Sequence, residues 1–314
     1  MVLNRVESSV THARFRDLGR FLRRGDLLVF NDTRVIPARL FAHKAGTGGR
    51  VEVLLLKRRA PLTWEVIVGG KGLSVGTALE VEGMPGLQAV VMQAYDGARR
   101  LLQFSGHITP LLSRIGSVPL PPYIHEPLRD PSDYQTVFAH QPGSAAAPTA
   151  GLHFTPSLLQ SIETAGVTLA RVLLHVGLDT FAPVDEDDPR EHRIHREYCE
   201  LDETTAEAVN RARRAGGRVV AVGTTTVRTL ETAARGAGPG TTVAPFAGET
   251  DLLILPGHTF RAVDLMITNF HLPRSTLLML VSAFAGRERI LAAYETAKAE
   301  GYRFYSFGDA MLIV

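Results

Sequence analysis

The chain has 314 residues, of which 45% are apolar and 21% charged, and this ordinary composition excludes a disordered chain, a collagen-like fibre and a coiled coil. The longest apolar run, 277–285, is too short to cross a membrane, and the first residues lack the apolar core of a signal peptide. The single cysteine, Cys199, excludes an intrachain disulfide, so we expect a cytoplasmic protein that does not bind a membrane.

The charge of the chain is unevenly distributed although its net value is only +2. Residues 1–60 carry 13 basic and 5 acidic side chains, a net charge of +8. Such a region attracts the phosphate backbone of a nucleic acid. A solvated surface helix is the alternative explanation. The spacing of five arginines suggests such a helix, namely Arg14, Arg16, Arg20, Arg23 and Arg24.

The first predicted elements are strands. Residues 27–30 form an apolar run that predicts a buried strand. From Gly49 to about Ile108, short alternating runs rich in valine and leucine are separated by turn residues. This texture is typical of a small antiparallel sheet or barrel. The proline-rich residues 119–123 would end the region as a stiff linker.

Predicted helices and strands alternate after this linker. Thr155 begins a helix that Gly166 ends, and Ser275 caps an apolar helix that runs to Ala285. The other predicted helices cover 204–215, 223–234 and 287–300, and the predicted strands cover 168–175, 218–222, 262–268 and the end of the chain. The sequence therefore predicts an α/β fold, in which a discontinuous α/β domain at 1–46 and 119–314 contains an inserted small antiparallel β-barrel domain at 47–118.

Four strand-to-loop junctions concentrate polar residues, at 30–34, 223–228, 268–275 and 302–309. Ligands of open α/β sheets bind beyond the carboxyl ends of the strands, so junctions on one edge would form one cleft. For any one junction, a turn or a helix cap is the better explanation, but four together favour a site. The candidate substrate-binding residues are Asn31, Thr33, Arg34, Thr224, Thr225, Arg228, Asn269 and Arg274.

The junction at 223–228 is similar to an anion-binding loop. Small residues at the start of a helix leave backbone N–H groups exposed, and Arg228 could pair with a carboxylate there. The chain has neither a GxxxxGK[ST] motif nor a GxGxxG motif after a strand, which argues against P-loop hydrolysis and dinucleotide-dependent hydride transfer.

Three of the 11 histidines are candidates for general acid–base catalysis, namely His153, His175 and His271. A hydrogen-bonded structural histidine is the alternative for each. His192 and His195 do not form an HExxH motif, so we expect no metal site. The acidic neighbours of Cys199 would raise its pKa and make it a poor nucleophile.

Several motifs together resemble one enzyme family, the S-adenosylmethionine:tRNA ribosyltransferase-isomerases of the queuosine pathway. The motifs occur in the family's order and span Gly25 to the end of the chain. They are GDLLVFNDTRVIPARL at 25–40, PLPPYI at 119–124, YQTVF at 134–138, AAPTAGLHF at 146–154, LHVGL at 174–178, VGTTTVRTLE at 222–231, ITNFHLPRSTLLMLVSAFAG at 267–286 and GDAMLI at 308–313.

The resemblance implies an α/β domain with an inserted barrel and a specific reaction. Such enzymes transfer the ribosyl part of S-adenosylmethionine to 7-aminomethyl-7-deazaguanine at a tRNA wobble position. They isomerise it to epoxyqueuosine and release adenine and methionine. S-adenosylmethionine is a consumed substrate, so no cofactor is implied, and we expect a monomer whose partners are this donor and the tRNA.

The chemistry suggests roles by residue type. The three candidate histidines would transfer protons, and Asp32 or Asp309 would orient them or balance the sulfonium charge. Arg228 or Arg274 would hold the methionine carboxylate.

Two other functions stay open at this point. Members of the family begin with a longer segment that includes an Arg-Asp-x-Ser-Arg-Leu-like stretch, so the chain could be a catalytically impaired tRNA-binding relative. A generic methyltransferase is the second alternative, and the lack of a glycine-rich first loop argues against it.

Overall fold

A computed structural model of the chain describes residues 1–126, 128–177, 184–192 and 194–314. Leu178, which ends one family-like motif, lies outside these residues. The chain forms two compact units. The α/β unit comprises Met1–Arg34, Ser132–Gln141 and Ala147–Val314, and the barrel unit comprises Val35–Pro131 and Pro142–Ala146. The predicted α/β domain with an inserted barrel is confirmed.

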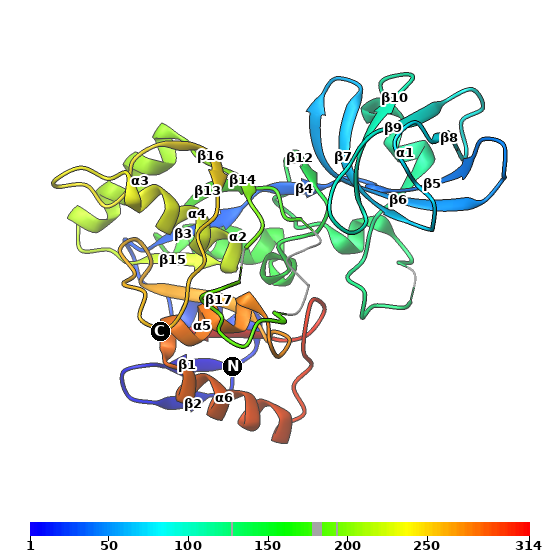
Figure 1. Cartoon of the computed structure of the whole chain (residues 1–314). Helices are drawn as coiled ribbons and strands as arrows, with labels where there is room; N and C mark the ends of the chain where they lie inside the picture. The colour runs from blue at the N-terminus through cyan, green and yellow to red at the C-terminus, as the bar shows by residue number, and fades with distance from the viewer. Residues whose placement is uncertain (127, 178–183, 193) are drawn as a thin grey trace. The chain divides into compact units, whose positions relative to one another are not determined.

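The barrel unit is a closed ring of six antiparallel strands (Figure 1). These are β5 (Arg39–Lys44), β6 (Arg50–Ala60), β7 (Thr63–Gly69), β8 (Ala78–Val81), β9 (Gln88–Ala94) and β10 (Arg99–Phe104), in the order β5-β6-β7-β10-β9-β8. Alternation along β6 buries Val51, Val53 and Leu55 inside the ring. Because β5 pairs with both β6 and β8 and closes the ring, the unit includes residues that precede the boundary predicted at 47.

Three short elements follow the ring, η2 (Thr109–Leu111), α1 (Leu112–Ile115) and β11 (Gly116–Ser117), of which β11 pairs with β5. Strands β4 (Thr33–Val35) and β12 (Gln141–Ser144) form a separate two-stranded pair.

A nine-stranded sheet is the centre of the α/β unit. Its strands are β16 (Phe246–Thr250), β14 (Glu197–Leu201), β13 (Thr168–Leu174), β3 (Leu27–Asn31), β15 (Val219–Val222), β17 (Leu265–Asn269), β18 (Ala310–Ile313), β1 (Val2–Asn4) and β2 (Ser9–Thr11), in that order. Strands β13, β3, β15 and β17 are parallel, and β18 is antiparallel to β17. The early strand at 27–30 does join the sheet, and every residue of β3 is buried.

The predicted helices of the α/β unit are confirmed. They are α2 (Pro156–Thr164), α3 (Glu203–Arg214), α4 (Thr224–Arg235), α5 (Thr276–Ala285) and α6 (Arg287–Ala299), with the 3-10 turns η1 (Phe15–Arg20), η3 (Pro131–Tyr134) and η4 (Thr149–His153). Thr155 caps α2 by accepting from Leu158 N at 3.2 Å, and Ser275 caps α5 by accepting from Leu278 N at 3.1 Å. Among the described residues, no helix has the length and apolarity needed to cross a membrane.

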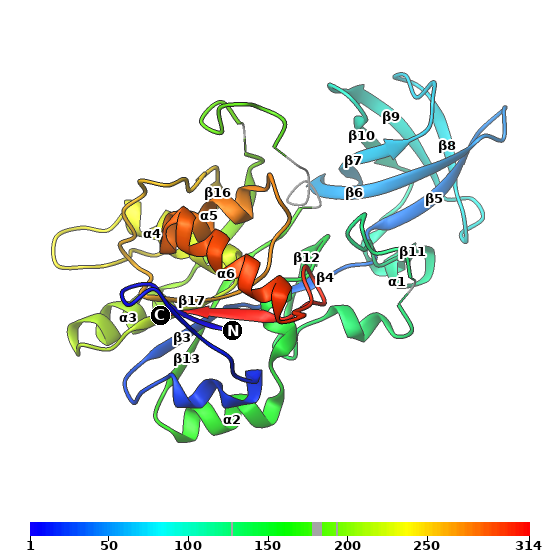
Figure 2. The ribbon, with the colours of Figure 1, turned by 90° about the horizontal axis from the view of Figure 1, so that it is seen from below.

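Each face of the sheet has its own core. Leu27 and Val29 of β3 pack with residues of α3, α4, α5 and α6, whereas Leu28 and Phe30 pack with residues of η1 and α2. Figure 2 shows α5 and α6 on one side of β17, and α2 with the blue helical turn next to it on the other. Successive side chains of a strand therefore point into different cores.

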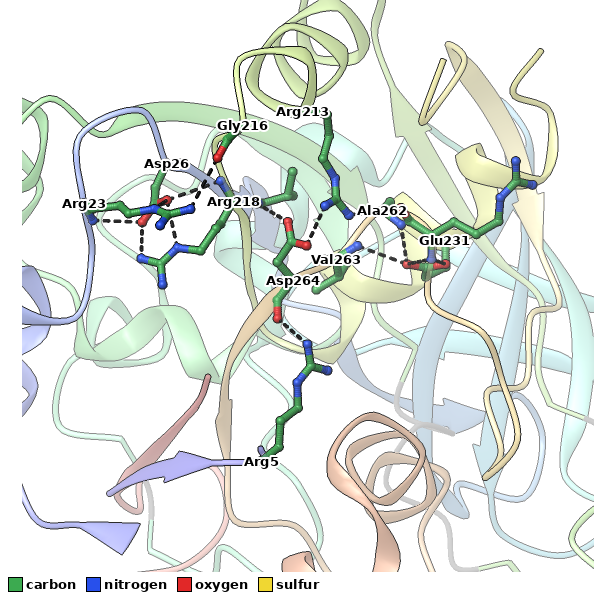
Figure 3. Close-up of polar contacts among 12 residues, drawn as sticks. Arg5, Arg23, Asp26, Arg213, Gly216, Arg218, Glu231, Ala262, Val263 and Asp264 are labelled. Carbon is green, nitrogen blue, oxygen red and sulfur yellow. Dashed lines mark hydrogen bonds and ion pairs between the residues drawn. The ribbon is translucent and has the colours of Figure 1, made fainter. Parts of the chain in front are cut away.

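Ion pairs hold the amino edge of the sheet (Figure 3). Asp26, which is fully buried, receives a hydrogen bond from Arg218 Nη2 at 2.6 Å. Burial opposes ionisation of Asp26, but the bonds from Arg218 and Arg23 hold the pKa of this carboxyl below its usual value. Asp264 pairs with Arg213, and Arg5 donates to the Asp264 carbonyl at 2.8 Å. These contacts lie at the edge away from the predicted site, so they serve the fold.

Candidate functional site

The four polar junctions lie on one edge of the sheet. Strands β3, β13, β15 and β17 are parallel, so their carboxyl ends meet at the same edge, and β18 begins beside the end of β17. The loop that ends at Asp309 precedes β18 and therefore also reaches this edge. The candidate residues divide between the two faces of the sheet, however, because adjacent strand residues point in opposite directions. We name these sets the α4-side group, which includes Asn31, Thr225 and Arg228, and the η1-side group, which includes His153, Asn269 and Asp309.

Asn31 connects the elements of the α4-side group. Its Nδ2 donates to Leu174 O at 2.9 Å and to Thr225 Oγ1 at 3.3 Å. Its Oδ1 accepts from Leu174 N at 3.0 Å and from Thr33 N at 3.1 Å. An asparagine amide offers two donor and two acceptor positions, and all four are used here. A substrate would have to displace one of these bonds, so the geometry gives Asn31 a positioning role.

His175 follows β13 and is held at several atoms. Its Nδ1 lies 2.9 Å from Thr33 Oγ1, and its backbone N–H donates to Tyr198 O at 3.0 Å. The His175 ring also stacks on the ring of Tyr198, with 6.2 Å between centroids. Burial lowers the pKa of His175, which keeps the imidazole neutral near pH 7. Because Thr33 engages Nδ1, proton exchange with a substrate would use Nε2.

Arg228 lies in α4 and already has a carboxylate partner within the chain. Its Nη1 pairs with Glu197 Oε2, and its Nε donates to Leu252 O at 3.1 Å. The other oxygen of Glu197 accepts from Gly177 N at 2.9 Å, two residues after His175. Arg228 Nη2 is buried and has no hydrogen-bond partner among the described residues. Sequence analysis did not name Glu197 as a site residue. It follows His192 and His195, the two histidines from which no metal site is expected.

The loop before α4 is more enclosed than a typical anion-binding loop. Gly223 adopts a φ of 86°, a conformation that favours glycine, and its N–H donates to Ile267 O at 2.8 Å. Thr224 and Thr225 are both buried, and Thr225 accepts the bond from Asn31. Donor binding at this loop stays a prediction.

His271 and Arg274 follow β17 and make local contacts. His271 Nε2 lies 2.7 Å from Thr268 Oγ1, and its backbone N–H donates to the Tyr294 hydroxyl at 2.8 Å. Arg274 donates through Nε to Val184 O and through Nη2 to Asp185 O, both at 3.1 Å. Its guanidinium therefore fixes the backbone of another loop. Arg34 is exposed, and its role stays a prediction.

The pH dependence of stability should report on His271. Burial lowers its pKa to about 3 from an ordinary value of 6.5, so the folded chain keeps the ring neutral. Between these values the unfolded chain binds the extra proton, and stability falls as the pH drops, by about 1.4 kcal/mol per unit. We expect His271→Gln to flatten this slope in denaturant unfolding between pH 7 and pH 5. His12→Gln, at an exposed histidine, is the control, and equal slopes for His271→Gln and the unmodified chain would contradict the burial argument.

The η1-side group contains His153, Asn269, Asp309 and Asp32. The His153 ring stacks on Phe15 with 4.9 Å between centroids and 25° between planes. Asn269 Oδ1 accepts from Thr149 Oγ1 at 2.9 Å. Three buried polar atoms, His153 Nε2, Asn269 Nδ2 and Asp32 Oδ1, lack a hydrogen-bond partner within the described part of the chain. Burial raises the pKa of Asp32 and lowers that of His153. Buried polar groups are normally hydrogen-bonded, so these three atoms are available to a ligand.

A cavity of about 460 Å³ opens beside His153 and Asp309 and lies entirely within the α/β unit. Its apolar floor includes Ile267 and Leu312 of the sheet. Asp309 Oδ2 accepts from Arg303 N at 2.7 Å, which fixes the carboxylate at the cavity. A pocket of this size suits a small organic ligand.

His192 and Cys199, which the sequence excluded as a metal ligand and as a nucleophile, have these surroundings in the structure. His192 Nδ1 lies 2.8 Å from Glu186 Oε2, and no group of three potential metal ligands occurs among the described residues. Burial raises the pKa of Cys199 to about 11, which agrees with the expectation of a poor nucleophile, although burial rather than acidic neighbours is the main cause.

Comparison with known proteins identifies the family. The profile of the family described as "Queuosine biosynthesis protein" matches residues 1–313. An S-adenosylmethionine:tRNA ribosyltransferase-isomerase from Moorella thermoacetica is 54% identical over 318 residues, covering 100% of this chain and 92% of its own. A protein of the same name from Thermus thermophilus is 54% identical over 313 residues, covering 97% of this chain and 89% of its own. The crystal structure of an S-adenosylmethionine tRNA ribosyltransferase from Thermotoga maritima is 37% identical, with a TM-score of 0.55 over 100% of this chain and 91% of its own. The chain therefore belongs to the queuosine biosynthesis protein family.

Proposed function

We propose that this chain transfers and isomerises the ribosyl moiety of S-adenosylmethionine onto 7-aminomethyl-7-deazaguanine at the tRNA wobble position. The products are epoxyqueuosine-tRNA, adenine and methionine. The observation that carries the proposal is the identity of about half of all positions, over essentially the whole chain, with relatives that bear this enzyme's name. S-adenosylmethionine is consumed, so the proposal requires no cofactor.

The chemistry needs a base and a site for the leaving group. A sulfonium acidifies the adjacent ribose C–H, and a neutral histidine held in one orientation is suited to remove that proton. His175 fits this role best, because Thr33 fixes Nδ1 and burial keeps the ring neutral. His153 and Asp309 lie at the cavity and would act on the donor there. Arg228 would support the α4-side group through Glu197.

An activity assay tests the proposed function. The chain is incubated with S-adenosylmethionine and tRNA that carries the aminomethyl-deazaguanine, and adenine release and tRNA mass are followed by mass spectrometry. Adenine release with the mass gain of the ribosyl-derived group is expected. Tight tRNA binding without adenine release would indicate the catalytically impaired relative, and S-adenosylhomocysteine as product would indicate a methyltransferase.

The partner proposal is a tRNA that binds a cytoplasmic monomer, in part through the basic N-terminal region. Residues 1–60 carry a net charge of +8, and Arg14, Arg16, Arg20, Arg23 and Arg24 are all exposed. Phosphates neutralised by arginine release counterions, so we expect tRNA affinity to fall steeply between 50 and 200 mM salt, by at least about tenfold.

Filter binding over this salt range measures the effect. Replacing Arg16, Arg20 and Arg24 together by glutamine should reduce the salt slope, while replacing exposed Arg287 by glutamine should not. An unchanged slope in the triple variant would remove this region from the tRNA interface.

A further inference from the structure

We propose that the cavity beside His153 binds the adenine base of the donor. The inference rests on the proposed function, in which adenine is the leaving group. Nothing in the sequence analysis assigned this cavity, because its walls come from η1, η4, the sheet and the loop before β18, which are distant in sequence.

The walls of the cavity suit a flat aromatic ring. Phe15 and His153 stack at one wall with 25° between their planes, and Tyr302 contributes a further aromatic ring. The floor is formed by side chains of β17 and β18, Ile267 and Leu312. Aromatic and aliphatic walls of this kind bind a purine through apolar burial and stacking. A volume of about 460 Å³ holds a purine with part of its ribose.

The polar atoms at the cavity favour a base with hydrogen-bonding edges over a purely apolar group. His153 Nε2 is buried and has no partner among the residues described, which is costly unless a ligand supplies one. The Asp309 carboxylate also lines the cavity and is suited to accept from an exocyclic amino group. Adenine offers such an amino group beside ring nitrogens, whereas methionine offers no aromatic ring to stack.

The location of the cavity agrees with a leaving-group site. Asp309 directly precedes β18 at the carboxyl edge of the sheet, and η4 is tied to the end of β17 by the bond between Thr149 and Asn269. A base bound here therefore lies at the carboxyl edge of the sheet, beside the residues of the η1-side group.

Calorimetry with adenine as the probe tests the proposal on the whole chain. Phe15→Leu removes the stacking ring, and Ala13→Trp places a bulky side chain at a second residue that lines the cavity. We expect each variant to raise the dissociation constant of adenine at least tenfold. Phe260→Leu is the matched control, because Phe260 is a partly buried aromatic residue that packs into the core on the α4 side. The control should keep the affinity of the unmodified chain.

The outcomes separate the cavity from the proposed function. If the unmodified chain releases adenine from the donor but Phe15→Leu and Ala13→Trp, both folded by thermal melt, bind adenine normally, the cavity proposal is wrong and the function stands. If the unmodified chain binds adenine and both variants lose it, the cavity binds adenine, and a negative activity assay would then contradict the proposed function alone. No measurable binding of adenine to the unmodified chain at millimolar concentration would overturn the proposal.

Discussion

Replacing Arg228 by alanine is expected to lower the free energy of unfolding by about 3–5 kcal/mol, because Glu197 would remain buried without its cationic partner. Only 6% of each of the two side chains is exposed. The substitution also removes the donor to the Leu252 carbonyl, which Arg228 Nε contacts at 3.1 Å. An arginine that served only to bind a substrate carboxylate would spare the fold. Chemical denaturation followed by circular dichroism measures the difference.

Two further variants give this measurement its controls. Arg235 lies at the end of the same helix, is exposed, and pairs with Asp251 only at 3.9 Å, so Arg235→Ala should cost less than about 1 kcal/mol. A double variant, Arg228→Met with Glu197→Leu, removes both buried charges and should recover part of the lost stability. If Arg228→Ala keeps the free energy of unfolding of the unmodified chain but binds S-adenosylmethionine tenfold more weakly, the arginine contacts the donor directly.

The fold was predictable where local signals and burial agree. An apolar run that is buried on both faces predicted β3, and capping residues such as Thr155 and Ser275 predicted where helices begin. Sequence analysis missed β14, because Glu197–Leu201 holds two glutamates in five residues and shows neither an apolar run nor a regular alternation. The strand forms through antiparallel pairing with β13 and β16, which are distant in sequence. The predicted strand at 262–268 starts later, at Leu265, because the N–H groups of Ala262 and Val263 donate to the Glu231 carboxylate instead of a strand.

The sequence predicted that the candidate residues lie at one edge of the sheet, but not how they divide between its two faces. Ligands of α/β sheets bind at the carboxyl ends of the parallel strands, and the order of strands and helices along the chain is enough to predict that edge. The face on which a side chain lies depends on its exact register and on which helix covers that face, as the bond between Asn31 and Thr225 illustrates. The pairing of Arg228 with Glu197 joins residues 31 positions apart, and no local pattern marks it.

Replacing His175 by glutamine is expected to lower single-turnover rates by about 10²–10⁴-fold, the usual contribution of a positioned acid or base. Glutamine can still hydrogen-bond to Thr33 but cannot exchange a proton, so the melting temperature should change little. Rapid-quench assays at saturating donor and tRNA measure the rate. Burial lowers the pKa of His175 below its ordinary value of 6.5, so the base is fully available at pH 7 and the rate should decline only under more acidic conditions.

The choice of His175 over the other two histidines can itself be tested. The ring of His271 has a pKa of about 3 and would accept a proton poorly, and the ring of His153 stands in the cavity assigned to adenine. Thr33→Val keeps the shape of the partner but frees Nδ1, and we expect a smaller loss of rate together with a shifted acidic limb of the pH profile. His192→Gln, at a histidine whose ring Nδ1 lies 2.8 Å from the exposed Glu186, should react normally. A normal rate for His175→Gln at pH 7 would show that another residue is the base, because an amide cannot accept the proton that a catalytic imidazole accepts.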